Sequence, residues 1–200
     1  VQQFLTFLTQ LDTGQLPPSP HSFLKGFLDW QMAFTGVQLS KECEKLLNRQ
    51  INMEFAAGYA YEQMALYCLR SDVALDNFAD HFRQEACEEH KHARTFMDVL
   101  VKRNGQFVAE PIPSLVDYSK FQGIVELFEI AHKLETDVYA SIVSLADCAA
   151  KCKDKHMELI LDEFISHQVE QIHKISKMIT RVKNVREHHG QYALENMSLD

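Results

Sequence analysis

Carboxylate, imidazole and carboxamide side chains interrupt four apolar stripes that have helical spacing in this sequence. The residues are Glu54, Glu89 with His92, Glu135 and Gln168. The motif Glu89-x-x-His92 places a carboxylate and an imidazole on one face of a helix, a spacing used in bundles that bind two iron ions. Carboxylates with a single imidazole favour hard or borderline ions such as Fe and Mn over the ions that thiolates select. These residue types therefore predict a metal site.

All of these positions lie near the middle of their predicted helices, so their side chains fall in one layer whichever way each helix runs. Any one of them alone would more often be a satisfied structural group. Three glutamates that converge in a core as unpaired ions would cost several kcal/mol each, so either protonation or a bound cation must relieve that cost. A cation is the simpler answer, because one ion-binding layer then serves all three. We interpret Glu89 as the bridge between two ions, with Glu54 and His92 completing one ion and Glu135 the other.

Two further side chains complete the predicted site. Gln168 would orient water or dioxygen, and Tyr61, on the same helix face as the first glutamate, would hydrogen-bond the cluster. A second Glu-x-x-His motif, Glu170 to His173, is two residues out of frame with the apolar stripe of its helix, so we expect it to face solvent or a neighbour. In the inward frame this helix carries Gln168 and Gln171, which predicts a weaker ligand set for the second ion.

The elements that position these side chains follow from the scarcity of chain breakers. The 200 residues include only seven glycines and five prolines, about half of ordinary usage, which excludes most all-β folds. The apolar periodicity and the end signals predict long helices and a short last one. The predicted ranges are 41–68, 76–103, 124–152, 155–187 and 191–199.

The connections between these helices predict the topology. The first and third connections are a few residues long, which makes those helix pairs antiparallel. The connection between the second and third helices has about twenty residues and can extend roughly 65 Å, more than the about 42 Å length of a 28-residue helix. We therefore predict an all-α four-helix bundle, with a long crossover between helices two and three and a short C-terminal fifth helix.

Charge and cysteine content limit the partners and the compartment. The formal net charge of −8 disfavours nucleic acid as a partner and suits cations. The sequence has no apolar run long enough to span a membrane. Five cysteines form an odd number without the spacing of a disulfide scaffold, which favours a reducing compartment. Cys148 and Cys152 lie four residues apart, and we interpret them as two free thiols rather than a disulfide or a metal clip.

The N-terminal residues differ in composition from the rest of the chain. The first forty residues contain three charged side chains but five of the thirteen phenylalanines. We expect short helical pieces at 4–11 and 22–34, within an N-terminal arm at 1–39 that precedes a bundle domain at 40–200. The arm is interpreted as packing on its own domain or on a neighbouring subunit, and a targeting remnant is the alternative.

Four stretches of the sequence resemble eukaryotic ferritins, in particular their catalytic heavy-type subunits. The stretches are 47–54 (LNRQINME), 72–79 (DVALDNFA), 88–93 (EEHKHA) and 134–138 (LETDV). The resemblance extends over about residues 42–199. It implies a ferritin-like fold and a hollow cage of twenty-four subunits, formed alone or with other ferritin subunits.

The resemblance also implies an activity and its residues. Ferritins oxidise Fe(II) with dioxygen, bind two iron ions per catalytic subunit and store a ferric oxyhydroxide core. Light-type subunits lack the catalytic set, whereas all positions here have the expected residue type. Carried over by position, the ferroxidase residues are Glu54, Tyr61, Glu89, His92, Glu135 and Gln168.

The sequence departs from the family at the position where mineral is seeded. Family members use an inward-facing acidic patch, and the matching residues here are Gln84, Cys87, Glu88, Lys91 and Arg94. Glu88 is the one acid among them. We therefore expect mineral nucleation to be more impaired than iron oxidation.

Two other departures concern the iron-uptake channel and the arm. The family carries acids at the three-fold channel, near the start of helix four. Glu158 and Asp162 are the candidates, and a merely solvated helix face is the alternative. The arm at 1–39 has no counterpart in the ordinary cytosolic subunit, and by analogy it would lie on the outer surface and touch neighbours.

The function predicted from these features is iron storage and detoxification by a cytoplasmic ferroxidase. A secreted or organellar location is the alternative if a targeting segment is removed. A cage subunit or iron buffer with weak mineralisation is the second possibility. The absence of a second in-frame Glu-x-x-His motif disfavours a non-ferritin di-iron oxidase or oxygenase, and the buried acid layer disfavours a helical signalling protein.

Overall fold

Four long helices make up the regular structure of this computed structural model, which describes residues 38–114 and 123–188. The helices are α3 (Lys41–Cys68), α4 (Asp76–Lys102), α5 (Ile124–Lys151) and α6 (Lys155–His188). The four long predicted helices are confirmed, and each of their ends lies within one residue of its predicted position. The expected helical pieces at 4–11 and 22–34 and the short fifth helix at 191–199 lie outside the described residues.

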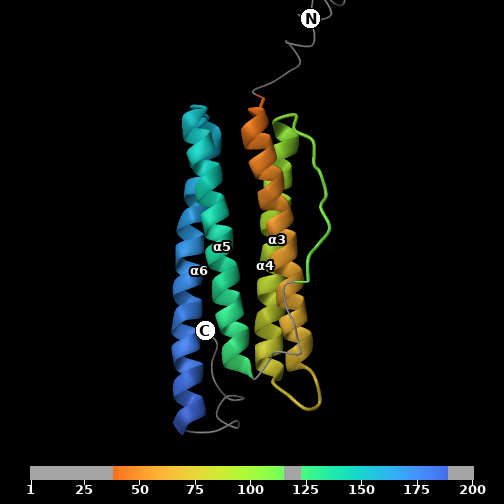
Figure 1. Cartoon of the computed structure of the whole chain (residues 1–200), viewed down its shortest axis with the longest axis vertical. Helices are drawn as coiled ribbons and strands as arrows, with labels where there is room; N and C mark the ends of the chain where they lie inside the picture. Colours follow the sequence, from red (N-terminus) through yellow and green to blue (C-terminus); the bar gives the residue numbers. More distant parts are fainter. Residues whose placement is uncertain (1–37, 115–122, 189–200) are drawn as a thin grey trace, which may run out of the picture.

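The helices form two antiparallel pairs that lie side by side (Figure 1). α3 packs on α4, α5 packs on α6, and α3 also contacts α5. α4 and α5 run in the same direction, so the chain must return along the bundle between them. The described part of this connection, residues 103–114, runs along α3. The predicted all-α four-helix bundle with a crossover between its second and third helices is therefore confirmed.

The buried apolar residues form two clusters, one toward each end of the bundle. One cluster includes Phe78, Phe82 and Phe128, and the other includes Leu47 and Phe96. On each helix the two clusters are separated by the residues near mid-helix, which carry the buried polar side chains. The clusters stabilise the bundle on both sides of the polar layer, so the layer is held in place without contributing apolar contacts itself.

Polar side chains of α3 bind the backbone of the crossover in a regular pattern. We call this pattern the asparagine ladder; its side chains are Glu44, Asn48 and Asn52, and its backbone partners are Gln106, Val108 and Glu110. Asn48, for example, accepts from the Val108 N–H at 2.7 Å and donates to the Gln106 carbonyl at 2.9 Å. Four helical residues rise about 6 Å and two extended residues about 6.6 Å, so the two spacings match.

A buried ion pair joins the end of α4 to the start of α6. Arg103 donates to both carboxylate oxygens of Asp154, at 3.1 and 2.7 Å, and also to the Gln38 carbonyl at 3.3 Å. Asp154 accepts from the Met157 N–H at 3.2 Å and so caps the first turn of α6. Burial alone would raise the pKa of Asp154, but the hydrogen bonds from Arg103 and Met157 outweigh it and lower that pKa.

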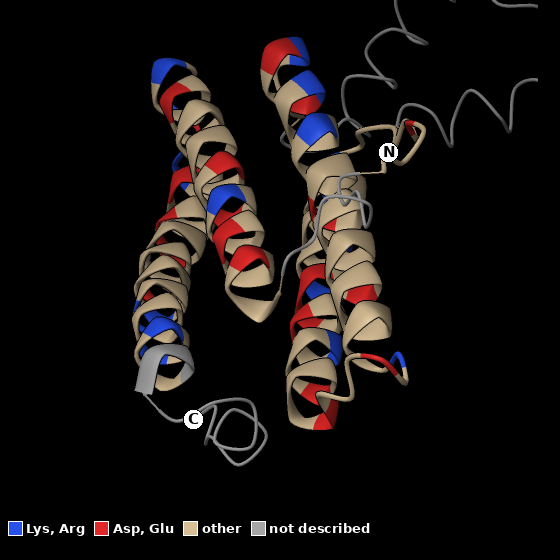
Figure 2. Ribbon diagram, turned by 60° about the horizontal axis from the view of Figure 1, so that its bottom comes forward, with Lys and Arg blue, Asp and Glu red and all other residues tan. Residues whose placement is uncertain are grey.

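Charge is mixed over the helices that the structure describes. On the face seen in Figure 2, acidic and basic residues are interspersed along the helices rather than gathered by sign. None of the described helices has the length and apolar character that a bilayer span requires.

Candidate metal centre

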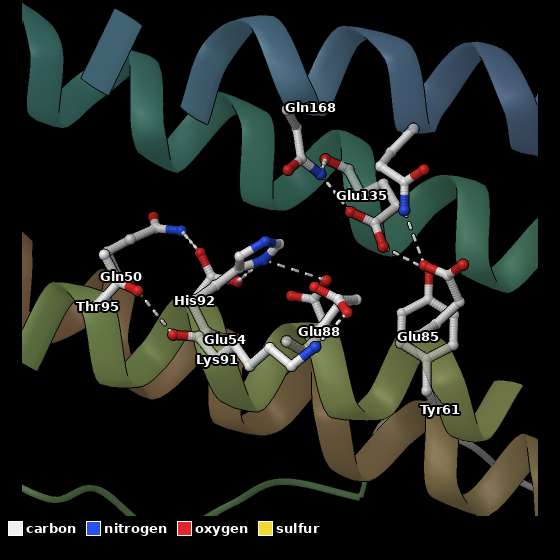
Figure 3. Close-up of polar contacts among 12 residues, drawn as sticks. Gln50, Glu54, Tyr61, Glu85, Glu88, Lys91, His92, Thr95, Glu135 and Gln168 are labelled. Atoms are coloured by element: carbon white, nitrogen blue, oxygen red, sulfur yellow. Dashed lines mark hydrogen bonds and ion pairs between the residues drawn. The ribbon is translucent and has the colours of Figure 1, made fainter. Parts of the chain in front are cut away.

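The polar layer at mid-bundle brings together side chains from all four helices (Figure 3). α3 supplies Glu54, α4 supplies Glu89, α5 supplies Glu135 and α6 supplies Gln168. Each of these residues is at most 3% exposed. The expectation that every helix aims a ligand-type side chain into the core is confirmed.

Three of the predicted ligands form one tight group. One ligand atom each from Glu54, Glu89 and His92 lie within 4.8 Å of one another. His92 Nδ1 is 3.9 Å from Glu54 Oε2 and 3.6 Å from Glu89 Oε1, too far for hydrogen bonds but close enough to share a small ion. Gln50 donates to the other oxygen of Glu54 at 2.5 Å and so fixes the orientation of that carboxylate.

Two carboxylate oxygens of this group have unused bonding capacity. Glu54 Oε2 and Glu89 Oε2 are buried and, while both carboxyls are ionised, accept no hydrogen bond from any residue that the structure describes. A protonated Glu54 would donate to Glu89. An unsatisfied buried acceptor costs about 1–3 kcal/mol, and more if it is charged. A cation between these oxygens and His92 would satisfy both, so the donor set fits a metal ion.

Glu135 is held on the far side of the layer by two neighbours. The Tyr61 hydroxyl donates to one of its carboxylate oxygens and the Gln168 amide donates to the other. Gln168 also donates to the Glu135 backbone carbonyl at 3.1 Å. The predicted hydrogen bond from Tyr61 to the cluster is confirmed, whereas Glu135 does not share the tight group of Glu54, Glu89 and His92.

Glu85 is a further polar residue of the site that the sequence patterns did not indicate. It lies one turn before Glu89 on α4, accepts from Gln171 at 2.8 Å and lies 3.8 Å from His81 Nδ1. Burial, followed by the negative charge of Glu135, raises the pKa of Glu85. Its spacing of four residues from Glu89 was the available signal, because residues i and i+4 share a helix face.

Burial raises the pKa of the three glutamates in the layer and so favours their protonated forms. It raises the pKa of Glu89 to about 8, with the charge of Glu135 as the next cause. Burial and then Glu89 raise the pKa of Glu54 well above its usual range. Burial also raises the pKa of Glu135, although the hydrogen bonds from Tyr61 and Gln168 oppose the shift. The carboxyl groups of the layer thus favour protons, which a metal ion must displace when it binds.

The metal-free protein is expected to lose stability as the pH rises. Glu89 has a pKa of about 8 in the folded protein and an ordinary value of 4.5, so the folded state holds its proton where the unfolded state has lost it. The free energy of unfolding should therefore fall between about pH 5 and pH 8, by up to about 1.4 kcal/mol per pH unit for one such carboxyl.

This dependence can be measured by urea unfolding in the presence of a chelator. Glu89→Gln, which cannot titrate, should show a flatter profile than the wild type at the same subunit concentration. An equal slope for the two proteins would contradict a raised pKa at Glu89.

The remaining predicted residues lie away from the tight group. Glu88 is partly exposed on α4 and pairs with Lys91 at 2.5 Å. Glu158 pairs with Lys155 in the first turn of α6, and Asp162 is exposed one turn later. Their assignment to nucleation and to a channel stays a prediction, because both depend on neighbouring subunits. The second Glu-x-x-His motif is exposed at both of its ends, as predicted.

The fold and the site together define a four-helix bundle with one long crossover, in which two carboxylates and one imidazole could hold a metal ion at mid-bundle. A family model described as the ferritin-like domain of ferritin matches residues 44–185. The chain belongs to the ferritin family, whose members store iron.

Relatives come from plants and animals. The chain is 35% identical to the soma ferritin of Lymnaea stagnalis over 79% of this chain and 91% of the relative. It is 32% identical to the ferritin heavy chain of Echinococcus granulosus over 84% of this chain and 97% of the relative. It is also 32% identical to a chloroplastic ferritin of Malus baccata var. xiaojinensis, over 85% and 70% respectively.

Proposed function

We propose that this ferritin oxidises Fe(II) with dioxygen at the mid-bundle layer and stores the ferric product inside a cage of many subunits. Iron is both the substrate and the cargo. The observation that supports this best is the pair of buried oxygens, Glu54 Oε2 and Glu89 Oε2, left without hydrogen bonds beside His92. The proposed catalytic residues are Glu54, Tyr61, Glu89, His92, Glu135 and Gln168.

The proposed ligands would be distributed over two iron ions. Glu54 and His92 would hold one Fe(II), Glu135 the other, and Glu89 would bridge them. The carboxyl protons are lost as iron binds, because only the carboxylate is a good ligand. Gln168 would release Glu135 and orient water or dioxygen. Each Fe(II) would give one electron, so the pair would reduce one dioxygen to the level of hydrogen peroxide, with two protons supplied by water.

Tyr61 would position Glu135 during this reaction. Burial and the charge of Glu135 raise the pKa of Tyr61 well above its usual value, so the phenol keeps its proton and remains a hydrogen-bond donor. A donor to one oxygen of Glu135 leaves the other oxygen available once Gln168 turns away. The hydroxyl thereby fixes which carboxylate oxygen faces the iron.

We also propose an assembly of twenty-four subunits with a ferric oxyhydroxide core, in the cytoplasm. The family membership supports the assembly and the core, and the odd number of cysteines supports a reducing compartment. The arm at 1–39 is proposed to be separate from the bundle domain at 40–200, which is supported by the start of α3 at Lys41 and of the family match at residue 44.

The test of this function is aerobic Fe(II) addition to the purified assembly, at two ions per subunit, followed by native mass measurement. We expect oxidation well above the rate in protein-free buffer and retention of ferric iron in a particle of cage mass. A monomeric or dimeric mass, or oxidation no faster than in buffer, would overturn the proposal.

A second candidate is an iron buffer with weak mineralisation. It is favoured by the exposed bases Lys91 and Arg94 on α4, because Lys91 neutralises Glu88 at 2.5 Å. Positive charge at these positions opposes the accumulation of Fe(III).

The double variant Lys91→Glu/Arg94→Glu is therefore expected to build an iron core about severalfold faster, with the first oxidation step unchanged, since added carboxylates attract Fe(III). The measurement is the growth of the ferric absorbance at high iron loading. The matched control is Lys45→Glu/Arg49→Glu, the same charge change on the exposed face of α3. Equal core growth in both variants would exclude Lys91 and Arg94 as the cause.

A further inference from the structure

Three cysteine thiols converge at one end of the bundle, far from the carboxylate layer along the helices. Cys43 lies in the first turn of α3, Cys148 in the last turn of α5, and Cys152 directly after α5. Their Sγ atoms all lie within 4.8 Å of one another. Cys43 Sγ is 2.7 Å from Cys148 Sγ and 3.9 Å from Cys152 Sγ. Figure 1 places the start of α3 and the end of α5 at the same end of the molecule.

Two of the three thiols are buried and the third is exposed to solvent. Cys43 and Cys148 are 0% and 3% exposed and belong to an apolar cluster, where a buried thiol commonly acts as a small apolar side chain. Cys152 is exposed. Apolar packing does not require the exposed Cys152 thiol to lie beside the two buried thiols. A metal site does require this arrangement, because its ligands must converge and the ion must enter from solvent.

We propose that Cys43, Cys148 and Cys152 bind one thiophilic metal ion, with Zn²⁺ as the representative. Zinc binds thiolate sulfur at about 2.3 Å, so ligand sulfurs around one ion lie about 3.8 Å apart in tetrahedral geometry and about 4.0 Å apart in trigonal geometry. The Cys43–Cys152 separation of 3.9 Å already fits. Cys43 and Cys148 must separate by about 1 Å, which small rotations of two side chains about χ1 supply.

Ser40 provides polar support beside the three sulfurs. Its hydroxyl oxygen lies 3.3 Å from Cys152 Sγ and also accepts from the Cys43 N–H at 3.1 Å. In the metal-free protein the Cys152 thiol donates to this oxygen. Once Cys152 is a thiolate, the Ser40 hydroxyl can donate to the sulfur instead and hold it toward the ion. A water molecule from the exposed side would complete four-coordination.

The binding step balances in charge and protons. Three thiols lose three protons as one Zn²⁺ enters, which leaves a complex of net charge −1 at the partly exposed end of the bundle. No oxidant is required. A disulfide is the alternative product, but it would join two sulfurs at about 2.05 Å, would need an oxidant and would leave the third thiol without a role.

This site differs from the iron site in ligand chemistry. The mid-bundle layer presents carboxylates and imidazole, which suit Fe(II), whereas three thiolates select softer ions. The sequence suggested two free thiols at Cys148 and Cys152 because two ligands four residues apart do not make a site. The third ligand, Cys43, comes from another helix 105 positions away.

The proposal is tested by adding Cd²⁺ to the reduced, fully assembled protein and recording the ultraviolet thiolate-to-cadmium charge-transfer band. Carboxylates do not produce this band, so iron-site binding does not interfere. We expect the band to saturate at one thiolate-bound Cd²⁺ per subunit and to disappear when Zn²⁺ competes. Cys152→Ser should weaken binding by at least about tenfold, since even the loss of an outer partner of a metal ligand costs that much.

Two controls keep this test decisive. Cys87→Ser removes an exposed thiol outside the group and should leave the band unchanged. Cys152→Ser changes an exposed residue, and its native mass and Fe(II) oxidation rate should equal those of the wild type, which shows that the cage is intact. The proposal is overturned if the reduced wild type gives no band, or if a variant with all three cysteines replaced by serine gives the same band. It is also overturned if protein isolated without reductant has two fewer free thiols than the five in the sequence, because a disulfide would then be the native state.

Discussion

Replacing Glu89 with alanine is expected to slow Fe(II) oxidation by about 100-fold or more. Glu89 carries one of the two buried carboxylate oxygens that lack a hydrogen bond among the described residues and lies 3.6 Å from His92 Nδ1, and it is the carboxylate that we propose to bridge the two ions. Loss of an outer partner of a metal ligand already costs about 10–100-fold, and loss of a bridging ligand should cost more. The measurement is the initial rate at two Fe(II) per subunit.

Two further variants separate the chemistry from the fold. Glu89→Gln keeps the side-chain volume and should lose activity as Glu89→Ala does, which excludes a cavity as the cause. Glu170→Ala changes the exposed second Glu-x-x-His motif and should retain the wild-type rate. Equal rates for Glu89→Ala and wild type would refute the site assignment, although family membership would stand.

The largest expected effect on stability comes from Arg103→Met. Its side chain is 7% exposed and its partner Asp154 10% exposed, so the substitution leaves a carboxylate largely out of water without the guanidinium that donates to both of its oxygens. Breaking such a pair by removing one partner costs about 3–5 kcal/mol. Asp154 also caps α6 by accepting from the Met157 N–H. Without Arg103 to hold the carboxylate in place, the first turn of that helix should loosen.

Urea unfolding of the metal-free protein at a fixed subunit concentration measures this effect. The control is Arg70→Met, which removes an ion pair with Asp72 whose side chains are 53% and 63% exposed; solvent screens such a pair, so its loss should change stability little. Because the pKa of Asp154 is lowered in the folded state, the contribution of Arg103 should persist above about pH 4 and vanish as Asp154 protonates at lower pH. A loss no greater than that of Arg70→Met would contradict the role assigned to the buried pair.

The helices were predictable because their ends carry local signals. Ser40 caps α3 by accepting from the Cys43 N–H, as its position before an acidic first turn indicated. The mid-bundle layer was predictable for a related reason. Residues in the middle of helices of similar length meet at one height in any bundle, so Glu54 and Glu135 could be placed together without knowledge of the packing.

The details within the layer and the thiol group were not predictable in this way. The hydrogen bonds that hold Glu135 depend on the distance between α3, α5 and α6, which no local pattern encodes. Cys43 lies beside Cys148 only because α3 packs against α5, which brings the first turn of α3 next to the last turn of α5. Pairings between distant segments depend on tertiary packing, which the local patterns of a single sequence do not encode.

The asparagine ladder between α3 and the crossover restricts how the length of this connection can change. Its rungs engage alternate backbone amides, because an extended chain repeats every two residues while the helix presents a side chain every four. Inserting or deleting two residues between the end of α4 and Glu110 moves the chain by one rung and keeps the bonded amides facing α3. A change of one residue turns the other set of amides toward the helix. Length variation in this segment should therefore be tolerated in steps of two.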